Sequence, residues 1–133
     1  MISEQLSFLP DSLPDSHPFP PARERTVWNA LPQRVKDRFL KAGEAALAAT
    51  IAPLPLSLWL DFSHIGRRTA WEDAYFSRRA RLCALVCAEC VEHTGRFLGA
   101  IADTVWALCE ESAWQLPAHN SYIRDTPQLP LPD

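Results

Sequence analysis

The sequence predicts an all-α protein built from antiparallel helix pairs, and three observations favour this class. Apolar residues recur at helical spacing in three long segments. A short turn at Gly95 separates the last two of these segments. The 12 prolines, which interrupt helices, gather mostly near the two ends of the chain. We find no convincing strand pattern, and 133 residues correspond to a single domain.

The first expected helix spans residues 31–50, and Pro53 and Pro55 end it. The next segment, LSLWLDFS at 56–63, fits either a short helix or an extended piece, and we favour the helix. The apolar positions of the first helix share one face, namely Val35, Phe39, Ala42 and Ala46.

The second long helix is expected over residues 71–93. Thr69 and Glu72 match a capping box, in which two side chains satisfy free N–H groups at the helix start. Gly95 provides a C-terminal stop. We expect its buried face to hold Phe76, Ala80, Cys83, Cys87 and Val91. We expect its opposite, solvent-facing arc to hold Arg78, Arg81, Glu89 and Glu92.

A third helix is expected over residues 96–112. Two helices joined by so short a turn must run antiparallel, so the second and third helices form an αα-hairpin. We therefore divide the chain into an extended proline-rich lead (1–25), a helical hairpin core (26–116) and an extended proline-rich tail (117–133). The apolar stripe of the third helix is Leu98, Ile101, Val105, Leu108 and Cys109.

Composition excludes several function classes. The net charge of −3 and pI near 5.8 give no chain-wide basic field for nucleic acid or an anionic membrane. No apolar run reaches the roughly 18 residues of a membrane span. The start lacks the features of a signal peptide, so we expect a cytoplasmic protein. The common phosphate, nucleotide, serine-hydrolase and zinc-protease motifs do not occur in the sequence.

The cysteines raise the question of a metal site. The spacing Cys83-x3-Cys87-x2-Cys90 resembles the iron–sulfur signature of radical SAM enzymes. Cys87-x2-Cys90-x2-His93 resembles half of a zinc site, but no second half occurs elsewhere in the sequence. All three cysteines fall in the middle of a predicted helix, on its apolar face. We therefore expect them to pack as small hydrophobic residues and expect no metal and no cofactor.

The stretch CEESAWQLPAHN, which ends at Asn120, combines residue types that suit a binding site. Glu110 and Glu111 fall in the last predicted helical turn, where acids oppose the helix dipole at a cost of about 0.3–1 kcal/mol each. An arginine or a functional demand should compensate. Trp114 offers a flat apolar face, whereas His119 and Asn120 offer oriented hydrogen bonds, and this mixture suits sugar rings. Alternatively, Trp114 packs on the hairpin and His119 or Asn120 caps a turn.

These residues also carry a family resemblance. Five segments, in this order, resemble the N-terminal helical region of heparinase II/III-like proteins: FSHIGRR (62–68), YFSRR (75–79), AECVE (88–92), GRFL (95–98) and WALCEESAWQLPAHN (106–120). The resemblance runs from about Leu54 to Asn120. It implies an (α/α) toroid of antiparallel helix pairs, followed in whole members by a β-sandwich domain.

Characterised members of this family are polysaccharide lyases that cleave uronic-acid polymers by β-elimination. The resemblance implies that an Asn or His neutralises the uronate carboxylate, which makes the C5 proton more acidic. Asn120 is the first candidate for this role and His119 the second, and Trp114 and Glu111 are candidates for substrate binding. The implied partners are a uronic-acid polysaccharide or oligosaccharide, the rest of the toroid and the β-sandwich domain.

Whole members of the family are several times longer than this chain. In them a tyrosine protonates the leaving oxygen, and the only tyrosines here are Tyr75, which falls in a buried helix pattern, and Tyr122. We therefore expect a truncated product, a split-gene piece or a fragment that is inactive by itself. The alternative hypothesis is a non-enzymatic helical module that binds a partner through uncovered apolar surface.

Overall fold

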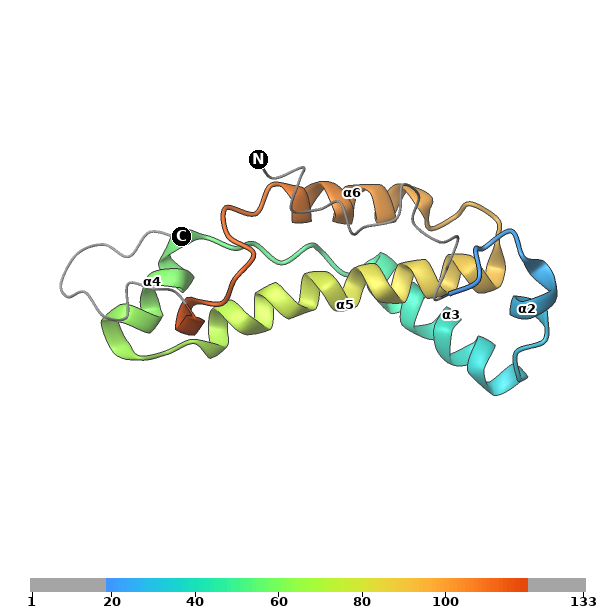
Figure 1. Cartoon of the computed structure of the whole chain (residues 1–133), viewed down its shortest axis with the longest axis horizontal. Coiled ribbons are helices and arrows are strands. Elements are labelled where there is room, and N and C mark those ends of the chain that lie inside the picture. The colour runs from blue at the N-terminus through green and yellow to red at the C-terminus, as the bar shows by residue number, and fades with distance from the viewer. Residues whose placement is uncertain (1–18, 120–133) are drawn as a thin grey trace, which may run out of the picture.

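The computed structural model describes residues 19–119, and all regular structure in this range is helical (Figure 1). The predicted all-α class is confirmed. The segment at 56–63, for which an extended piece was the alternative, is helical. The elements are α2 (Arg25–Asn29), α3 (Gln33–Ala48), α4 (Leu56–Ile65), α5 (Thr69–Glu92), α6 (Leu98–Cys109) and a 3-10 turn, η1 (Pro117–His119).

Helix α5 is the axis of the molecule, and its 24 residues extend over about 36 Å. Helix α3 packs across it, and α6 returns alongside it in the opposite direction (Figure 1). His93 and Gly95 make the turn between α5 and α6, with φ angles of 56° and 84° in the left-handed region. The predicted antiparallel αα-hairpin is therefore present. Helix α4 and η1 lie at the opposite end of α5, near its N-terminus (Figure 1).

Helix α3 approaches α5 closely at Gly43. A Cβ atom placed on Gly43 would overlap the Cβ of Ala88 and lie 3.3 Å from the ring of Phe97. Gly43 is also the buried residue of α3, although the sequence pattern assigned burial to its neighbour Ala42, which is exposed. The absence of a side chain thus permits the close crossing of the two helices.

The buried side chains form two clusters at different levels of α5. The first cluster has Trp59, Trp71, Tyr75 and Ala113 at its centre and is surrounded by Leu54, Leu58, Leu60 and Leu116. The second has Leu85, Ala88 and Phe97 at its centre and is surrounded by Leu40, Ala46, Ala100 and Ile101. The first cluster joins α4 to the loop after α6, and the second joins α3 to the αα-hairpin.

The predicted buried face of α5 is wrong. Phe76 is 52% exposed and Cys83 is exposed, whereas Glu89, which we placed in the solvent-facing arc, is buried. The reason is that polar side chains of that arc bind backbone groups of neighbouring segments. Such bonds depend on tertiary structure and leave no trace in the hydrophobic pattern of one helix.

Arg81 is one such side chain. Its Nη1 donates to the carbonyl oxygens of Ala46 and, at 2.7 Å, of Ala49, at the C-terminal end of α3. Its Nε donates to the buried Thr104 hydroxyl of α6 at 3.1 Å. A guanidinium at a helix C-terminus satisfies free carbonyl groups and opposes the negative end of the helix dipole. One side chain of α5 thus holds both neighbouring helices.

Glu89 plays the corresponding part at the start of α6. Its Oε1 accepts a hydrogen bond from the Gly95 N–H at 2.7 Å, and its Oε2 accepts one from the Phe97 N–H at 3.2 Å. Arg25 of α2 binds the C-terminal end of α5. It donates to the carbonyl oxygens of Cys90 and Val91 at 2.6 and 2.8 Å. These bonds satisfy backbone groups that the helix ends leave unpaired.

Several finer predictions also need correction. No side chain caps α5, and Thr69 is its first residue rather than its N-cap, so the capping box is not formed. Helix α6 ends at Cys109, three residues earlier than expected, and Glu110 and Glu111 therefore follow it. Its buried face is centred on Thr104, whereas three members of the predicted stripe are exposed, namely Leu98, Val105 and Cys109.

The cysteines are less buried than predicted. Cys83 and Cys109 are exposed, and Cys87 and Cys90 are half-buried. Within residues 19–119, no three or more His, Cys, Asp or Glu side chains come together in a way that could hold a metal ion. In the same range, no helix is both long and apolar enough to cross a membrane.

Candidate functional site

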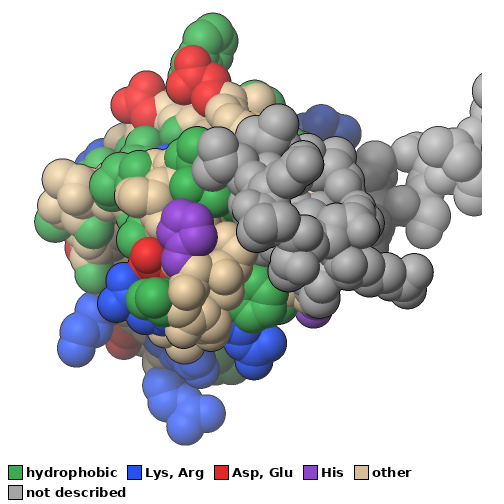
Figure 2. Space-filling view, turned by 90° about the vertical axis from the view of Figure 1, so that its left-hand side faces the viewer, with side chains coloured by type: hydrophobic (Ala, Val, Ile, Leu, Met, Phe, Trp, Pro, Cys, Tyr) green, Lys and Arg blue, Asp and Glu red, His purple; other side chains and the backbone are tan. Residues whose placement is uncertain are grey.

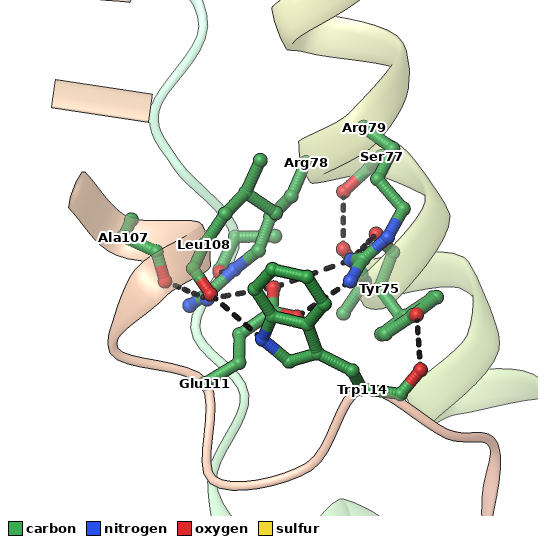
Figure 3. Close-up of polar contacts among 10 residues, drawn as sticks. Tyr75, Ser77, Arg78, Arg79, Ala107, Leu108, Glu111 and Trp114 are labelled. Atoms are coloured by element: carbon green, nitrogen blue, oxygen red, sulfur yellow. Dashed lines mark hydrogen bonds and ion pairs between the residues drawn. The ribbon is translucent and has the colours of Figure 1, made fainter. Parts of the chain in front are cut away.

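The segment after α6 folds back onto α5, and Glu111 anchors it. The Glu111 side chain is only 1% exposed. Arg79 Nη2 lies 2.7 Å from its Oε2, and Arg78 Nη1 lies 3.3 Å from its Oε1 (Figure 3). The compensating arginine expected for acids at this position is therefore present as a pair. Both arginines come from the YFSRR segment of α5.

Tyr75 makes a second connection from α5 to the same segment. Its hydroxyl donates to the carbonyl oxygen of Trp114 at 2.7 Å (Figure 3). The Arg79 guanidinium lies 3.2 Å from the centroid of the Tyr75 ring and donates to the Tyr75 carbonyl oxygen at 3.0 Å. Because the ring is buried and its hydroxyl is engaged, Tyr75 holds the segment in place and is not a free proton donor.

Trp114 is held at two points and yet remains accessible. In addition to the Tyr75 contact with its backbone, its indole Nε1 donates to the Leu108 carbonyl oxygen at 3.2 Å (Figure 3). Its side chain is nevertheless 67% exposed. The ring is thus oriented in advance while most of the residue is open to solvent. This geometry lowers the entropy cost of stacking a flat ligand on the indole.

A pocket of about 240 Å³ lies beside the Glu111 anchor, between α4, α5 and the end of α6. Apolar and aromatic side chains supply much of its wall, and Arg78, Glu110, Glu111 and Ser112 supply its polar groups. Its remaining lining residues are Leu54, Leu56, Trp59, Trp71, Ala107 and Ala113.

The structure brings together two of the four predicted site residues. Glu111 and Trp114 lie close together, and Figure 3 shows the Trp114 ring in front of the Glu111 carboxylate. His119 ends η1 and is exposed. Asn120 lies outside the described residues. Glu111 makes three hydrogen bonds to the two arginines, so its role in the described chain is to anchor the segment.

Sequence reasoning missed three residues of this site, namely Tyr75, Arg78 and Arg79. Tyr75 and Arg78 were assigned to the packing of α5, one to its interior and one to its solvent face. One signal could have found the arginines. Paired acids at a helix end need a basic partner. An antiparallel α6 places its C-terminus beside the consecutive residues Arg78 and Arg79 of α5.

Basic side chains mark the neighbouring end of the molecule, which α4 forms. Figure 2 views this end and shows Lys and Arg side chains gathered in the lower part of the surface. Arg67 and Arg68, in the turn between α4 and α5, have side chains that are 54% and 57% exposed. Their ion-pair partners are Asp61 and Glu72, so much of their charge is balanced locally.

Comparison with known proteins gives no further guidance, because no protein-family model and no curated protein matches the chain.

Proposed function

We propose that this chain forms part of the (α/α) toroid of a heparinase II/III-like polysaccharide lyase and contributes a carbohydrate-binding surface to it. The reaction would be β-elimination on a uronic-acid polymer, and the chain would not complete the catalytic machinery by itself. The proposal rests on the dense resemblance between about Leu54 and Asn120. The antiparallel pair of α5 and α6 agrees with the helix pairs of such a toroid.

The observation that supports carbohydrate binding best is the fixed, exposed indole of Trp114. An aromatic face is apolar and matches the apolar C–H face of a pyranose ring, while polar groups at its edge match the hydroxyls. The indole is held by hydrogen bonds at its backbone and at its ring nitrogen, so binding would not have to order it.

Binding of acidic oligosaccharides tests this proposal on the chain itself. We expect short alginate or hyaluronan oligosaccharides to bind more tightly than a neutral maltooligosaccharide of equal length, as measured by isothermal titration calorimetry. Trp114→Ala should weaken this binding about tenfold, which corresponds to the upper range of an aromatic stacking contribution. The matched control is Trp106→Ala, because Trp106 is a 70% exposed tryptophan of α6. Equal losses in both variants, or no binding of any acidic oligosaccharide, would contradict the proposal.

Within a full-length lyase, we propose that Asn120 neutralises the uronate carboxylate, with His119 as the second candidate. An amide N–H can donate to a carboxylate at any pH. Loss of one positioned donor typically lowers the rate by about 10²–10³. Asn120→Ala should therefore reduce turnover strongly while leaving the melting temperature nearly unchanged. A parallel loss of stability would assign Asn120 a structural role.

A helical interaction module is the second candidate, and exposed apolar side chains favour it. Phe76 and Val86 of α5 and Leu98, Val105 and Trp106 of α6 are all more than a third exposed. Exposed apolar side chains on neighbouring helices can contribute to a protein interface. Analytical ultracentrifugation separates the two candidates. Self-association that Val105→Asp abolishes, together with no binding of acidic oligosaccharides, would favour the module.

A further inference from the structure

One side of α3 carries basic side chains that the described chain does not pair. Arg34, Arg38 and Lys41 are exposed, and no hydrogen bond or ion pair joins their side chains to another residue in the range 19–119. At 3.6 residues per turn, they share the side of α3 opposite Gly43, where α3 meets α5. Figure 1 shows the two helices crossing at an angle. These three residues, the basic row, therefore lie on a side of α3 that α5 does not cover.

The charge on this side of α3 is positive. Asp37 is the acid that lies there, and its carboxylate accepts a hydrogen bond from Gln33 Nε2 at 2.8 Å. Glu44, the other acid of α3, is paired with Arg96. Three basic groups thus stand against one carboxylate. Like charges one turn apart destabilise a helix, so an anion that lay along the row would relieve a repulsion that the described residues leave uncompensated.

The spacing of the basic row favours a polymer whose charges are far apart. At a rise of 1.5 Å per residue, Arg34 and Arg38 are separated by about 6 Å along the helix axis, and Arg38 and Lys41 by about 4.5 Å. These intervals are comparable with the length of one sugar unit in a polysaccharide. Duplex DNA is a poorer match, because it carries one charge per about 1.7 Å of its axis.

An open hollow borders the basic row and provides space for a chain of sugar units. Its lining residues are Asp37, Arg38, Lys41, Ala42 and Ala45. The alanine side chains are short and the two basic side chains are long, so the surface is low beside the positive charges. The Asp37 carboxylate can accept hydrogen bonds from sugar hydroxyls, whereas it would repel a polymer that presents only phosphates.

We propose that the basic row of α3 binds a linear polyuronate that carries a carboxylate on every sugar unit. The choice of a polyuronate as the polyanion rests on the proposed function. The anion-binding surface itself rests on the unpaired basic groups, their spacing and the hollow. It is separate from the Trp114 surface, because α3 carries the row and Trp114 lies in the segment after α6. The two surfaces would contact different parts of one long polymer.

The experiment compares four ligands by isothermal titration calorimetry on the whole chain: oligomannuronate, hyaluronan, a neutral maltooligosaccharide of equal length and duplex DNA. Mannuronate carries a carboxylate on every unit and hyaluronan on every second unit. We expect oligomannuronate to bind most tightly, the neutral sugar not to bind to the row, and the affinity for oligomannuronate to fall as salt is added. Equal affinity for oligomannuronate and hyaluronan, DNA binding as tight as that of oligomannuronate, or no binding of any polyanion would each overturn the proposal.

Paired substitutions locate the binding on α3. Arg38→Gln with Lys41→Gln should weaken oligomannuronate binding about tenfold, because each exposed ionic contact contributes up to about fivefold. The matched control is Arg23→Gln with Lys36→Gln, which removes the same charge outside the row and should leave the affinity nearly unchanged. Equal losses in both double variants, each checked for folding by circular dichroism, would mean that only net charge matters and would overturn the proposal.

Trp114→Ala distinguishes failure of this proposal from failure of the proposed function. If Trp114→Ala abolishes oligomannuronate binding and the Arg38→Gln, Lys41→Gln variant retains it, the α3 surface is excluded and the Trp114 surface stands. If the reverse is found, the α3 surface stands and the role of Trp114 in carbohydrate binding is excluded. Losses in both variants support two surfaces on one polymer.

Discussion

Gly43 is the residue on which the crossing of α3 and α5 depends. Gly43→Ala would place a methyl group against Ala88, and such overpacking costs about 1–3 kcal/mol. A gain of about 1 kcal/mol in helix propensity offsets part of this cost. We expect a net loss of stability in urea denaturation. Gly99→Ala in α6 is the control, because no atom lies within 4 Å of the added Cβ. It should stabilise the protein by about 0.5–1 kcal/mol. Similar effects at both positions would contradict the proposed crossing.

The four cysteines should differ in reactivity. Burial raises the pKa of Cys87, and the neighbouring Cys83 adds to this effect; burial and Cys87 likewise raise the pKa of Cys90. Because the thiolate is the reactive form, a raised pKa leaves less of it at a given pH. We expect iodoacetamide to modify the exposed Cys83 and Cys109 first. The rate at Cys87 should reach its midpoint at a higher pH than that of a free thiol. Peptide mapping by mass spectrometry measures these rates, and uniform modification would show that the fold does not protect α5.

At the scale of elements, the end of α6 depends on the Glu111 anchor. Glu111→Ala would leave Arg78 and Arg79 without their buried partner, and breaking a buried ion pair costs about 3–5 kcal/mol. Glu110→Ala removes the same charge from an exposed neighbour and should change stability by less than about 0.5 kcal/mol. Thermal unfolding of both variants measures the difference. Equal melting temperatures would mean that Glu111 does not anchor the segment.

The last residue of α5, Glu92, carries a carboxylate that should titrate unusually low. Hydrogen bonds from Arg96 and Thr94 lower the pKa of Glu92 to about 2. A lowered pKa in the folded state gives a contribution to stability that is complete above the ordinary value of about 4.3 and is lost as the pH falls toward 2. Carbon-detected NMR titration should show this pKa. Arg96→Ala should return it toward the ordinary value, and an unchanged titration in that variant would assign the shift to another cause.

At the scale of the whole molecule, the chain by itself should not catalyse β-elimination. The reaction needs a positioned proton donor, and the hydroxyl of Tyr75 is buried and bound to the Trp114 carbonyl oxygen. We expect no increase in the ultraviolet absorbance of unsaturated uronates when the chain is incubated with alginate, hyaluronan or heparan sulfate. Product formation that survives Tyr75→Phe would show that another group donates the proton.

The sequence by itself determined the all-α class, the approximate extent of α3, α5 and α6 and the antiparallel turn at Gly95. These features depend on helical periodicity and on local turn chemistry, and both are determined by residues that are close together in the sequence. It also indicated that acids in the last turn of the third predicted helix need compensation, by an arginine or by a functional demand. The family assignment, and with it the roles of His119 and Asn120, stays a prediction.

Only the tertiary structure decided which faces are buried. Arg81 and Glu89 looked solvent-facing because the pattern of one helix contains no information on the backbone groups of another. Gly43 became buried because α5 crosses α3 there. Arg78, Arg79 and Tyr75 became part of the site because α6 runs back along α5 and brings Glu111 and Trp114 to them. Contacts between residues distant in the chain depend on how the helices are placed in space, and residue spacing within one helix does not encode that placement.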